Sequence, residues 1–387
     1  MASQEREIER LERKKAKAQK RQKIAWVIIA LVVLALIVMR LCEIDFSSIG
    51  EKKDSDTAVS TSGFPYELDS GDDISFGSVS NSLYVLDETS YTVLSPSDAD
   101  VQQSFAHGYS NPVVAVSGSY SLLYDQGGVS YKLDTAKDSV YSDKSENTIL
   151  SADVSSSGSI ILSTTSDEAS STICVYDKNL NLDFRYNVSY GYVTRVAIDS
   201  RGSRIAFAAV NSENAQLKTV VYTMNIDDEE PRAQFEYYSS SVLDLRFSST
   251  DLFVVGNDFV SVISSLKDET KIYVQGSVKT VSYSYNSSDK LIFAYSDYSG
   301  SSSNKAAVIN RSGKVQEIAE VDSVIKDITA SSSQVTVLTS DEIITYKISN
   351  SEVVQRTEVD DSYSSVEQMS SSIFAKHQTL VELIQNS

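Results

Sequence analysis

The sequence offers two histidines for catalysis, and neither lies in a recognisable catalytic motif. His107 falls in the polar loop His107–Pro112, and His377 falls between the last two expected strands. A histidine that activates a nucleophile needs that nucleophile and an orienting carboxylate close in space. Ser and Asp are so frequent here that their proximity to His107 carries no information, and no G-x-S-x-G turn is present. We therefore assign no catalytic residue.

Sequence motifs for metals and cofactors are also absent. The chain contains no H-E-x-x-H, C-x-x-C, G-x-x-x-x-G-K-[ST] or G-x-G-x-x-G segment, and Cys42 and Cys174 are too few for a zinc cluster. Short acidic runs lack the spacing of a calcium-binding loop and are typical of solvated turns. They are Asp69 with Asp72 and Asp73, Asp98 with Asp100, residues 227–230, and Asp360 with Asp361. We predict no metal ion and no cofactor. Whether carboxylates from different repeats meet at the centre of the fold stays open.

Tyrosine is the most frequent aromatic residue, so the places where it gathers matter. The gathered tyrosines are Tyr186, Tyr190, Tyr192, Tyr237, Tyr238, Tyr283, Tyr285, Tyr295 and Tyr298. Aromatic residues near loops can form contact surfaces for a partner. In a fold of stacked sheets they more often fill the space between the sheets, and we favour that interpretation.

The elements that would position such residues recur along the chain from about residue 73 onwards. A Val or Ile opens one short strand, a polar turn comes after it, and a more apolar strand comes next. The paired positions are Ile74 with Leu83, Val113 with Leu122, Ile149 with Ile160, Val193 with Ile205, Val242 with Leu252, Val278 with Leu291, Val324 with Val335, and Val366 with Ile373. The opening residues lie 36 to 49 residues apart, which is the period of four-stranded propeller blades.

This period predicts an all-β propeller. The second strand of a copy, such as 204–209 or Leu252–Val255, is a nearly continuous apolar run, as expected of a strand covered on both faces. After seven copies the chain supplies three strands of an eighth, and the strand Phe64–Leu68 precedes the first copy. We expect this strand to complete the last blade and close the ring, which removes open sheet edges. Eight blades is our prediction, and seven blades with an irregular tail is the alternative.

The residues before the repeats predict a membrane anchor. Residues 1–23 read as a basic helix, Ile24–Met39 is uninterrupted apolar sequence, and residues 24–42 are long enough to span the hydrocarbon layer. A cleaved signal peptide is the rival interpretation, but no A-x-A-like site follows the apolar run. Most basic residues precede the span, so we expect the N-terminus in the cytoplasm. Residues 43–62 would then be a flexible linker and residues 63–387 an extracytoplasmic propeller.

The charge of the chain is divided between these parts. Residues 1–42 hold 10 of the 34 Lys and Arg and 4 of the 53 Asp and Glu, so the remaining residues carry 24 basic and 49 acidic side chains, a formal net charge of −25. Such a surface repels nucleic acid, because binding to phosphates depends on Lys and Arg. It favours cationic partners. We expect protein or glycan partners in the cell envelope and no nucleic acid.

These features together resemble membrane-anchored β-propeller proteins of Gram-positive bacteria, many of them domains of unknown function. The resemblance rests on the basic helix, the apolar span and the eight Ser-rich copies, which also look like diverged WD-type or quinoprotein-type repeats. No Trp-Asp dipeptide closes a blade, and the only tryptophan is Trp26, so the tryptophan-docking motif of quinoprotein repeats is missing. The resemblance implies an extracytoplasmic propeller on the cell membrane and supplies no functional residues.

The leading hypothesis from the sequence is a binding or scaffold module without enzymatic activity. An extracytoplasmic lyase or hydrolase, with its site at the mouth of the propeller channel, is the alternative, because propellers host many chemistries. A third option is a coupler in which the cytoplasmic helix reports events outside the membrane.

Overall fold

The computed structural model describes residues 63–68, 75–273, 279–286, 289–296 and 304–384. All of them belong to one compact unit, Ser62–Ser387. The expected basic helix (1–23), membrane span (24–42) and linker (43–62) lie outside the described residues. Within the described part of the chain, no helix combines the length and the apolar character needed to cross a membrane.

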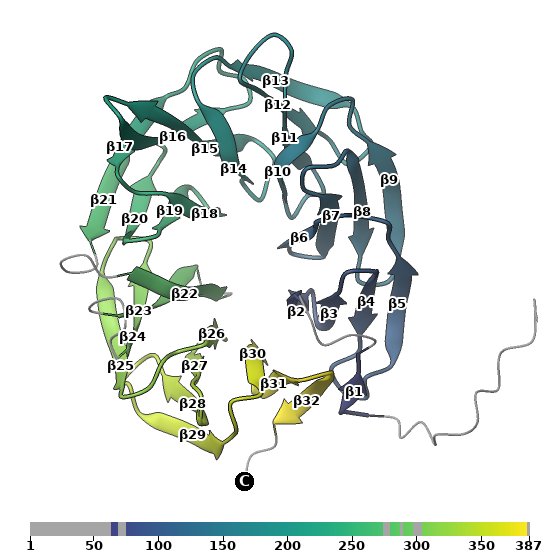
Figure 1. Ribbon diagram of the computed structural model, residues 1–387, viewed down its shortest axis with the longest axis vertical. Helices are drawn as coiled ribbons and strands as arrows, with labels where there is room; N and C mark the ends of the chain where they lie inside the picture. Colours follow the sequence, from purple (N-terminus) through teal and green to yellow (C-terminus); the bar gives the residue numbers. More distant parts are fainter. Residues whose placement is uncertain (1–62, 69–74, 274–278, 287–288, 297–303, 385–387) are drawn as a thin grey trace, which may run out of the picture. The chain divides into compact units, whose positions relative to one another are not determined.

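The described residues form eight antiparallel sheets of four strands, arranged as the blades of a ring (Figure 1). Blade 1 holds β2 (Ser75–Val79), β3 (Ser82–Leu86), β4 (Ser90–Leu94) and β5 (Val101–Ala106). Blade 2 holds β6 (Pro112–Ser117), β7 (Tyr120–Asp125), β8 (Ser130–Thr135) and β9 (Ser139–Lys144). Blade 3 holds β10 (Ile149–Val154), β11 (Ile160–Thr164), β12 (Ser171–Tyr176) and β13 (Leu182–Val188). Blade 4 holds β14 (Tyr192–Ile198), β15 (Arg204–Glu213), β16 (Gln216–Asn225) and β17 (Ala233–Tyr238).

The second half of the ring repeats this order. Blade 5 holds β18 (Val242–Ser248), β19 (Asp251–Gly256), β20 (Phe259–Ser264) and β21 (Asp268–Tyr273). Blade 6 holds β22 (Lys279–Asn286), β23 (Lys290–Ser296), β24 (Asn304–Asn310) and β25 (Val315–Val321). Blade 7 holds β26 (Asp327–Ala330), β27 (Gln334–Leu338), β28 (Glu342–Lys347) and β29 (Val353–Glu358). Blade 8 holds β30 (Tyr363–Met369), β31 (Ser372–His377), β32 (Leu380–Ile384) and β1 (Tyr66–Glu67). The first strand of each blade lies nearest the centre of the ring, and we call these eight the inner strands.

Blade 8 contains strands from both ends of the described chain. Tyr66 pairs with Val381 and Glu67 with Leu380, and the backbone N–H of Leu68 donates to the carbonyl of Thr379 at 2.7 Å. This pairing gives the eighth sheet its outer strand. The prediction of eight blades is therefore confirmed, and the seven-bladed alternative is wrong.

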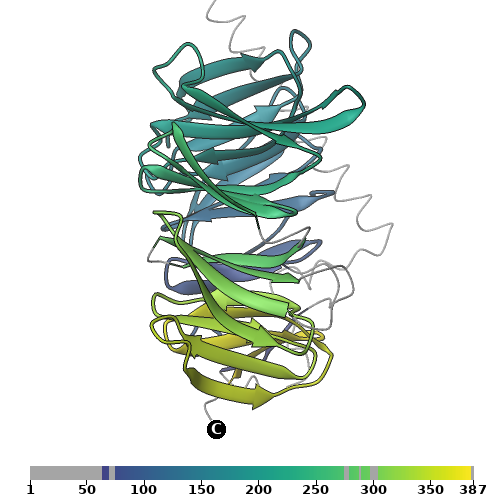
Figure 2. The ribbon, with the colours of Figure 1, turned by 90° about the vertical axis from the view of Figure 1, so that its left-hand side faces the viewer.

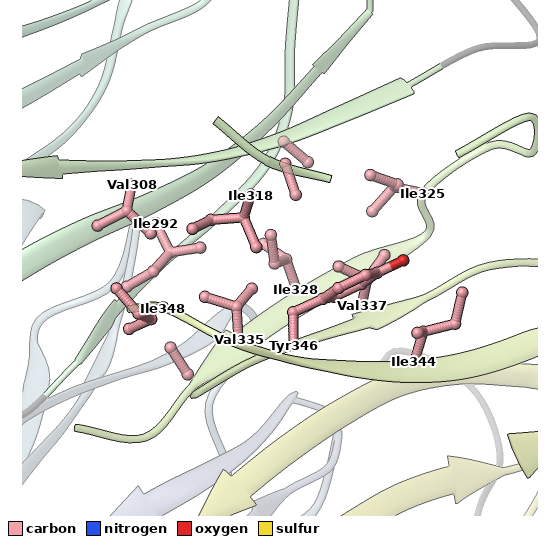
Figure 3. Close-up of a cluster of buried hydrophobic side chains, with 13 residues drawn as sticks. Ile292, Val308, Ile318, Ile325, Ile328, Val335, Val337, Ile344, Tyr346 and Ile348 are labelled. Carbon is pink, nitrogen blue, oxygen red and sulfur yellow. The ribbon is translucent and has the colours of Figure 1, made fainter. Parts of the chain in front are cut away.

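Neighbouring blades lie face to face, as the side view shows (Figure 2). The hydrophobic core is divided among the spaces between them. Figure 3 shows one such space, where Ile292 and Val308 of blade 6 pack against Val335 and Val337 of blade 7. All five residues of β11 are buried, as expected of a strand covered on both faces. Each fully buried aliphatic side chain contributes about 1.5–3 kcal/mol, so these contacts hold neighbouring blades together.

One expected strand begins later than the sequence pattern indicates. Val324 was the expected opening residue of the seventh copy, but it is 54% exposed and precedes β26, which begins at Asp327. Ile325, next to it, is buried in the core between blades 6 and 7 and takes the expected apolar position. The openers Ile74 and Val278 lie outside the described residues.

The clustered tyrosines divide between packing and exposure. Tyr237 is buried and stacks on Phe259 with ring centroids 4.4 Å apart, while Tyr186 lies against Phe207 at 5.9 Å. These rings fill the space between blades, as favoured from the sequence. Tyr190 and Tyr192, by contrast, are 50% and 68% exposed where the chain enters blade 4.

Candidate functional site

His107 is held by the backbone around it. Its Nε2 lies 3.0 Å from the carbonyl oxygen of Asp87, and the backbone N–H of Tyr109 donates to its Nδ1 at 3.4 Å. A carbonyl oxygen only accepts hydrogen bonds, so Nε2 carries the proton. Both ring nitrogens are therefore occupied, whereas a general base needs one nitrogen free for the proton it removes. This geometry gives His107 a structural role.

His377 belongs to a trio of side chains within blade 8. Its Nδ1 lies 3.4 Å from Oε1 of Glu382, and its ring stacks on Tyr363 with centroids 4.6 Å apart. The hydroxyl of Tyr363 donates to Oε2 of Glu382 at 2.7 Å. Burial and the neighbouring carboxylate of Glu382 raise the pKa of Tyr363 to about 12. The trio joins β30, β31 and β32 and brings no nucleophilic Ser or Cys to the histidine.

Polar side chains on the inner strands form a more extensive feature. Five inner strands carry a β-bulge at the same place in the strand. The residues directly after the bulge form one row around the ring, and they are Ser151, Arg195, Asp244, Ser282 and Ser365. A bulge bends its strand and re-aims the side chains beside it. Asp327 of β26 takes part in the same row, because it bonds to Ser282 and Ser365 on either side.

Most of these side chains bond to the inner strand of the next blade, whereas Ser365 donates to Asp327 in the preceding one. Ser151 accepts the backbone N–H of Val196 at 3.3 Å, and Nε of Arg195 donates to the carbonyl of Leu243 at 2.6 Å. The hydroxyl of Tyr285 donates to Oδ2 of Asp244 at 3.0 Å. The row continues where Ser282 Oγ donates to Oδ1 of Asp327 at 3.3 Å and the backbone N–H of Val366 donates to Oδ2 of Asp327 at 2.9 Å. Blades 3 to 8 are thus linked in sequence at their inner edges.

A second row lies two residues further along the inner strands. Asp153 accepts the backbone N–H of Val154 at 2.8 Å and that of Ile198, in the next blade, at 3.0 Å. Thr329 accepts the backbone N–H of Gln368 at 3.2 Å. Its hydroxyl lies 3.2 Å from Oε2 of Glu367, to which it donates.

Arg246 belongs to the second row but makes a different contact. Its guanidinium lies over the ring of Tyr285, 4.7 Å from the centroid, and the residue is exposed. Its positive charge acts to lower the pKa of Asp153, Asp244 and Glu367, which belong to blades 3, 5 and 8. One cation therefore acts on carboxylates from distant parts of the ring.

Burial has the largest effect on the acidity of these carboxyl groups. Desolvation raises the pKa of Asp153 to about 7, against the opposing effects of the backbone N–H groups of Ile198 and Val154 and of Arg246. Desolvation also raises the pKa of Asp244 and Glu367. The cause is common to all three, because burial among the inner strands disfavours the charged form.

We call this group the axial cluster, and its members are Asp153, Arg195, Asp244, Arg246, Tyr285 and Glu367. It combines carboxyl groups whose pKa is raised by burial, that of Asp153 to about 7, with the guanidinium of Arg246, which has no carboxylate partner within 4.0 Å among the described residues. Such a set can bind a charged ligand or transfer a proton. No group of three or more His, Cys, Asp or Glu residues in the described ranges is arranged to hold a metal ion.

The sequence analysis did not single out the axial cluster. The signal that could have identified it is a charged residue inside an apolar inner strand, as in Leu243-Asp-Leu-Arg-Phe247. The acidic runs that were singled out lie elsewhere: Asp98, residues 227–230, Asp360 and Asp361 belong to turns between strands. Asp69, Asp72 and Asp73 lie outside the described residues.

Comparison with known families and structures identifies the fold. The model of a family described as a family of unknown function (DUF5711) matches residues 66–381. A comparison with curated proteins finds no match.

Solved propellers resemble the chain at low sequence identity. The computationally designed Ika8 protein is 12% identical, with a TM-score of 0.58 over 83% of this chain and 98% of the designed chain. The C-terminal WD40 domain of Sif2 is 12% identical, with a TM-score of 0.58 over 84% of this chain and 99% of that domain. BamB from Moraxella catarrhalis is 12% identical, with a TM-score of 0.51 over 84% of this chain and 96% of BamB. At these identities the likeness shows the fold alone.

Proposed function

The chain belongs to the DUF5711 family of unknown function, and from this premise we propose that it is a single-pass membrane protein whose propeller binds a partner outside the cytoplasm. In this proposal the ring is a scaffold and the axial cluster is its recognition site. The partner is an envelope protein or a cell-wall glycan. A propeller fold alone hosts many functions, so the proposal rests on what the cluster contains.

The observation that carries the proposal is that charged side chains stand where neutral ones can also join the blades. Ser151 and Thr329 join neighbouring blades with neutral hydroxyl groups. Asp153 and Arg246 lie in the second row with Thr329 but carry charged groups, and desolvating the charge of Asp153 costs more free energy than burying a hydroxyl. Within the described residues, Arg246 adds no hydrogen bond to a neighbouring blade, and its guanidinium lies over the ring of Tyr285. A charged group that adds no hydrogen bond between blades favours a binding role.

The membrane part of the proposal rests on the sequence. The apolar length of residues 24–42 matches the hydrocarbon layer. The excess of Lys and Arg within residues 1–23 favours a cytoplasmic N-terminus. The propeller would then face the envelope, where the partners named above are found.

A capture experiment tests the binding function. The full chain with a C-terminal affinity tag is cross-linked in intact cells, and proteins and glycans that copurify are compared with those of Arg246→Gln. We expect a reproducible partner that the Arg246→Gln chain loses. Arg201→Gln is the matched control, because Arg201 is exposed in a turn outside the cluster. A partner set that is the same for all three chains would contradict recognition by the axial cluster.

Protease treatment of intact cells tests the orientation. We expect added protease to degrade the propeller while an epitope placed before residue 24 survives. Detergent lysis, which exposes both sides, is the control for protease activity. Survival of the propeller and loss of the epitope would reverse the proposed orientation.

An enzyme remains the second candidate, and a specific observation favours it. The pKa of Asp153 is raised to about 7, which suits a general acid or base at neutral pH. A lyase or hydrolase would use this carboxyl group with Arg246 to stabilise negative charge. Turnover of chromogenic ester or glycoside substrates by the full chain, lost in Asp153→Asn and kept in Arg201→Gln, would support it. Turnover that is equal in all chains would remove it.

A further inference from the structure

We infer that one end of blade 4 is a docking surface for a protein segment that carries Lys or Arg beside large apolar side chains. We call this end the blade 4 tip, and its exposed members are Tyr190, Tyr192, Leu217 and Tyr238. The inference rests on the proposed binding function. It adds a second contact surface, which shares no residue with the axial cluster, and the chemistry of the partner that this surface fits.

Strand pairing brings these side chains to the same end of the sheet. Tyr192, at the start of β14, lies opposite Val210 of β15. Beyond that pair, β15 and β16 continue as a hairpin through three more pairs, which are Asn211 with Lys218, Ser212 with Leu217, and Glu213 with Gln216. Tyr238 of β17 lies opposite Lys218. Strands lie about 4.8 Å apart and successive residues rise about 3.4 Å, so Tyr192, Leu217 and Tyr238 project from backbone positions within about 15 Å of one another.

The tip lies at the face of the ring opposite to the one where the described chain begins. Successive inner strands run parallel, because Ser151 bonds to Val196 and Asp153, two residues later, bonds to Ile198. Contacts between blades 7 and 8 keep the same order. In blade 8 the strands β30, β31, β32 and β1 alternate in direction, so β1 begins at the face where inner strands end. The tip is at the start of an inner strand, and the connection to residues 1–62 is therefore made at the other face.

Lys218 shows how this surface holds a cation. Its Nζ lies 2.7 Å from Oε2 of Glu213, 2.8 Å from Oε1 of Glu236 and 5.4 Å from the ring centroid of Tyr238. The hydroxyl of Tyr238 donates to Oε2 of Glu236 at 2.8 Å. An ammonium group is thus bound between carboxylates and a tyrosine ring, which combines ion pairing with a cation–π contact.

Tyr190 and Tyr192 lie close to acids but have no cation of their own. Among the described residues, no Lys or Arg lies over either ring. The loop between β11 and β12 reaches the segment just before these tyrosines, because Ser170 Oγ donates to the carbonyl of Ser189 at 3.3 Å. Two exposed acids on this loop take no part in the ion pairs of the described residues, and they are Asp167 and Glu168.

These features select a basic protein segment among the classes of partner. A Lys or Arg of the partner would lie over Tyr190 or Tyr192, beside the loop acids, and would be bound as Lys218 is. Leu217 offers an apolar contact in the same area. Nucleic acid and anionic lipid would be repelled, because the propeller is strongly acidic. A neutral glycan would stack on the tyrosines but would leave the loop carboxylates without a counter-charge.

A binding titration of the full chain in nanodiscs of zwitterionic phosphatidylcholine tests this inference. The probe is a fluorescently labelled peptide of three Arg-Gly-Leu-Gly repeats, and fluorescence anisotropy measures its affinity. Two control peptides carry Glu in place of Arg, or Ser in place of Leu. We expect saturable binding of the Arg–Leu peptide and affinity at least about tenfold weaker for each control peptide, because each lacks one of the two kinds of contact and tenfold corresponds to only about 1.4 kcal/mol. Chitotetraose, a neutral glycan, is titrated by calorimetry.

Substitutions at the tip locate the binding. Tyr192→Ser removes a ring, and the double variant Asp167→Asn with Glu168→Gln removes two charges. Each should weaken the Arg–Leu peptide about fivefold, as expected for the loss of exposed cation–π and ionic contacts. Tyr190→Ser replaces Tyr192→Ser if circular dichroism shows that the latter does not fold.

Matched controls lie at the opposite face of the ring. Leu182→Ser removes a side chain that is 53% exposed at the start of β13. The double variant Glu229→Gln with Glu230→Gln removes two exposed charges from the turn before β17. Both should keep the affinity within about twofold of the wild type. Equal weakening by tip variants and controls would show attraction by net charge alone and would overturn the inference. Chitotetraose binding that Tyr192→Ser abolishes, without peptide binding, would assign the tip to glycans and overturn it as well.

The result is separable from the fate of the binding function. If the peptide does not bind at the tip but a partner is still captured in cells through Arg246, the docking surface is wrong and the binding module stands. If the peptide binds at the tip but cells yield no partner, the docking surface stands and the envelope partner is wrong. If neither occurs, both proposals fail.

Discussion

Asp327 concentrates contacts between blades in one side chain. Its Oδ1 accepts the backbone N–H of Ile328 at 2.8 Å and the hydroxyl of Ser282, in blade 6, at 3.3 Å. Its Oδ2 accepts from Ser365 Oγ at 2.6 Å and from the backbone N–H of Val366 at 2.9 Å, both in blade 8. One carboxyl group thus joins three blades at their inner edges.

Asp327→Ala should lower the free energy of unfolding by about 3 kcal/mol, because it leaves buried donors of two other blades without an acceptor. Urea denaturation followed by circular dichroism measures this loss. Asp361→Ala is the control: Asp361 is 85% exposed and pairs with Lys326 at 3.3 Å, so its loss should cost at most about 1 kcal/mol. Equal losses in the two variants would show that the contacts of Asp327 between blades add no more stability than an exposed ion pair.

Asp153 should give the protein a stability that falls as pH rises. Its pKa is about 7 in the folded chain, against an ordinary value of 3.8, so the folded state binds the proton more tightly than the unfolded state. The associated stability is fully present below the ordinary pKa and is lost as pH rises through about 7. Asp153→Asn removes this titration, while Asp244 and Glu367 remain in both proteins. The unfolding free energy of the wild type should therefore fall relative to that of Asp153→Asn as pH rises from about 5 to about 8. Urea denaturation at each pH measures both free energies. If the two proteins changed in stability by the same amount across this range, the raised pKa of Asp153 would be contradicted.

At the scale of single strands, the sequence predicts the buried elements well. Runs such as Leu252–Val255 could be assigned to covered strands because every residue in them is apolar, and all are buried. The inner strands are harder to interpret. They alternate polar and apolar residues, and the meaning of Asp153 or Arg246 depends on a neighbour about 40 residues away, across a blade boundary. The pattern within one strand does not predict contacts between residues so far apart in the sequence. The axial cluster can therefore be identified only from the structure.

The edge strand β1 shows how a short element can be stabilised by the residues on either side of it. Only Tyr66 and Glu67 pair with β32, but Leu68 is buried at 6% exposure in a core shared by blades 8 and 1. Phe64, on the other side, packs on Phe374 with centroids 5.0 Å apart. Side-chain burial therefore adds to two residues of backbone pairing.

Leu68→Ala should destabilise the protein by about 3 kcal/mol, the cost of removing a buried leucine side chain and leaving a cavity. Thermal or urea unfolding monitored by circular dichroism measures it. Leu182→Ala is the matched control, because Leu182 lies on the outer strand β13 and is 53% exposed; this variant should stay within about 0.5 kcal/mol of the wild type. A Leu68→Ala chain as stable as the control would mean that β1 does not hold the ring.

At the scale of the whole propeller, every blade is buried on two sides by its neighbours. Separate cores lie between successive blades, such as that of Ile161 with Phe207 and that of Leu338 with Val366. A linear array of repeats would leave two terminal blades with one neighbour each, and such blades unfold first. Pairing β1 with β32 removes those ends. The stability of a blade far from blade 8 should therefore depend on the closure.

Hydrogen exchange can test this dependence with Leu68→Ala. The strand β11 (Ile160–Thr164) is fully buried in blade 3, well away from blade 8. If the ring opens as one unit, a loss of about 3 kcal/mol at Leu68 should speed exchange in β11 about a hundredfold, as much as in β31. Mass spectrometry of peptides from both strands under native conditions measures the two rates. Faster exchange in β31 with an unchanged rate in β11 would instead show that blade 8 opens by itself. The ring would then be a chain of independent neighbours, with β1 protecting one sheet edge.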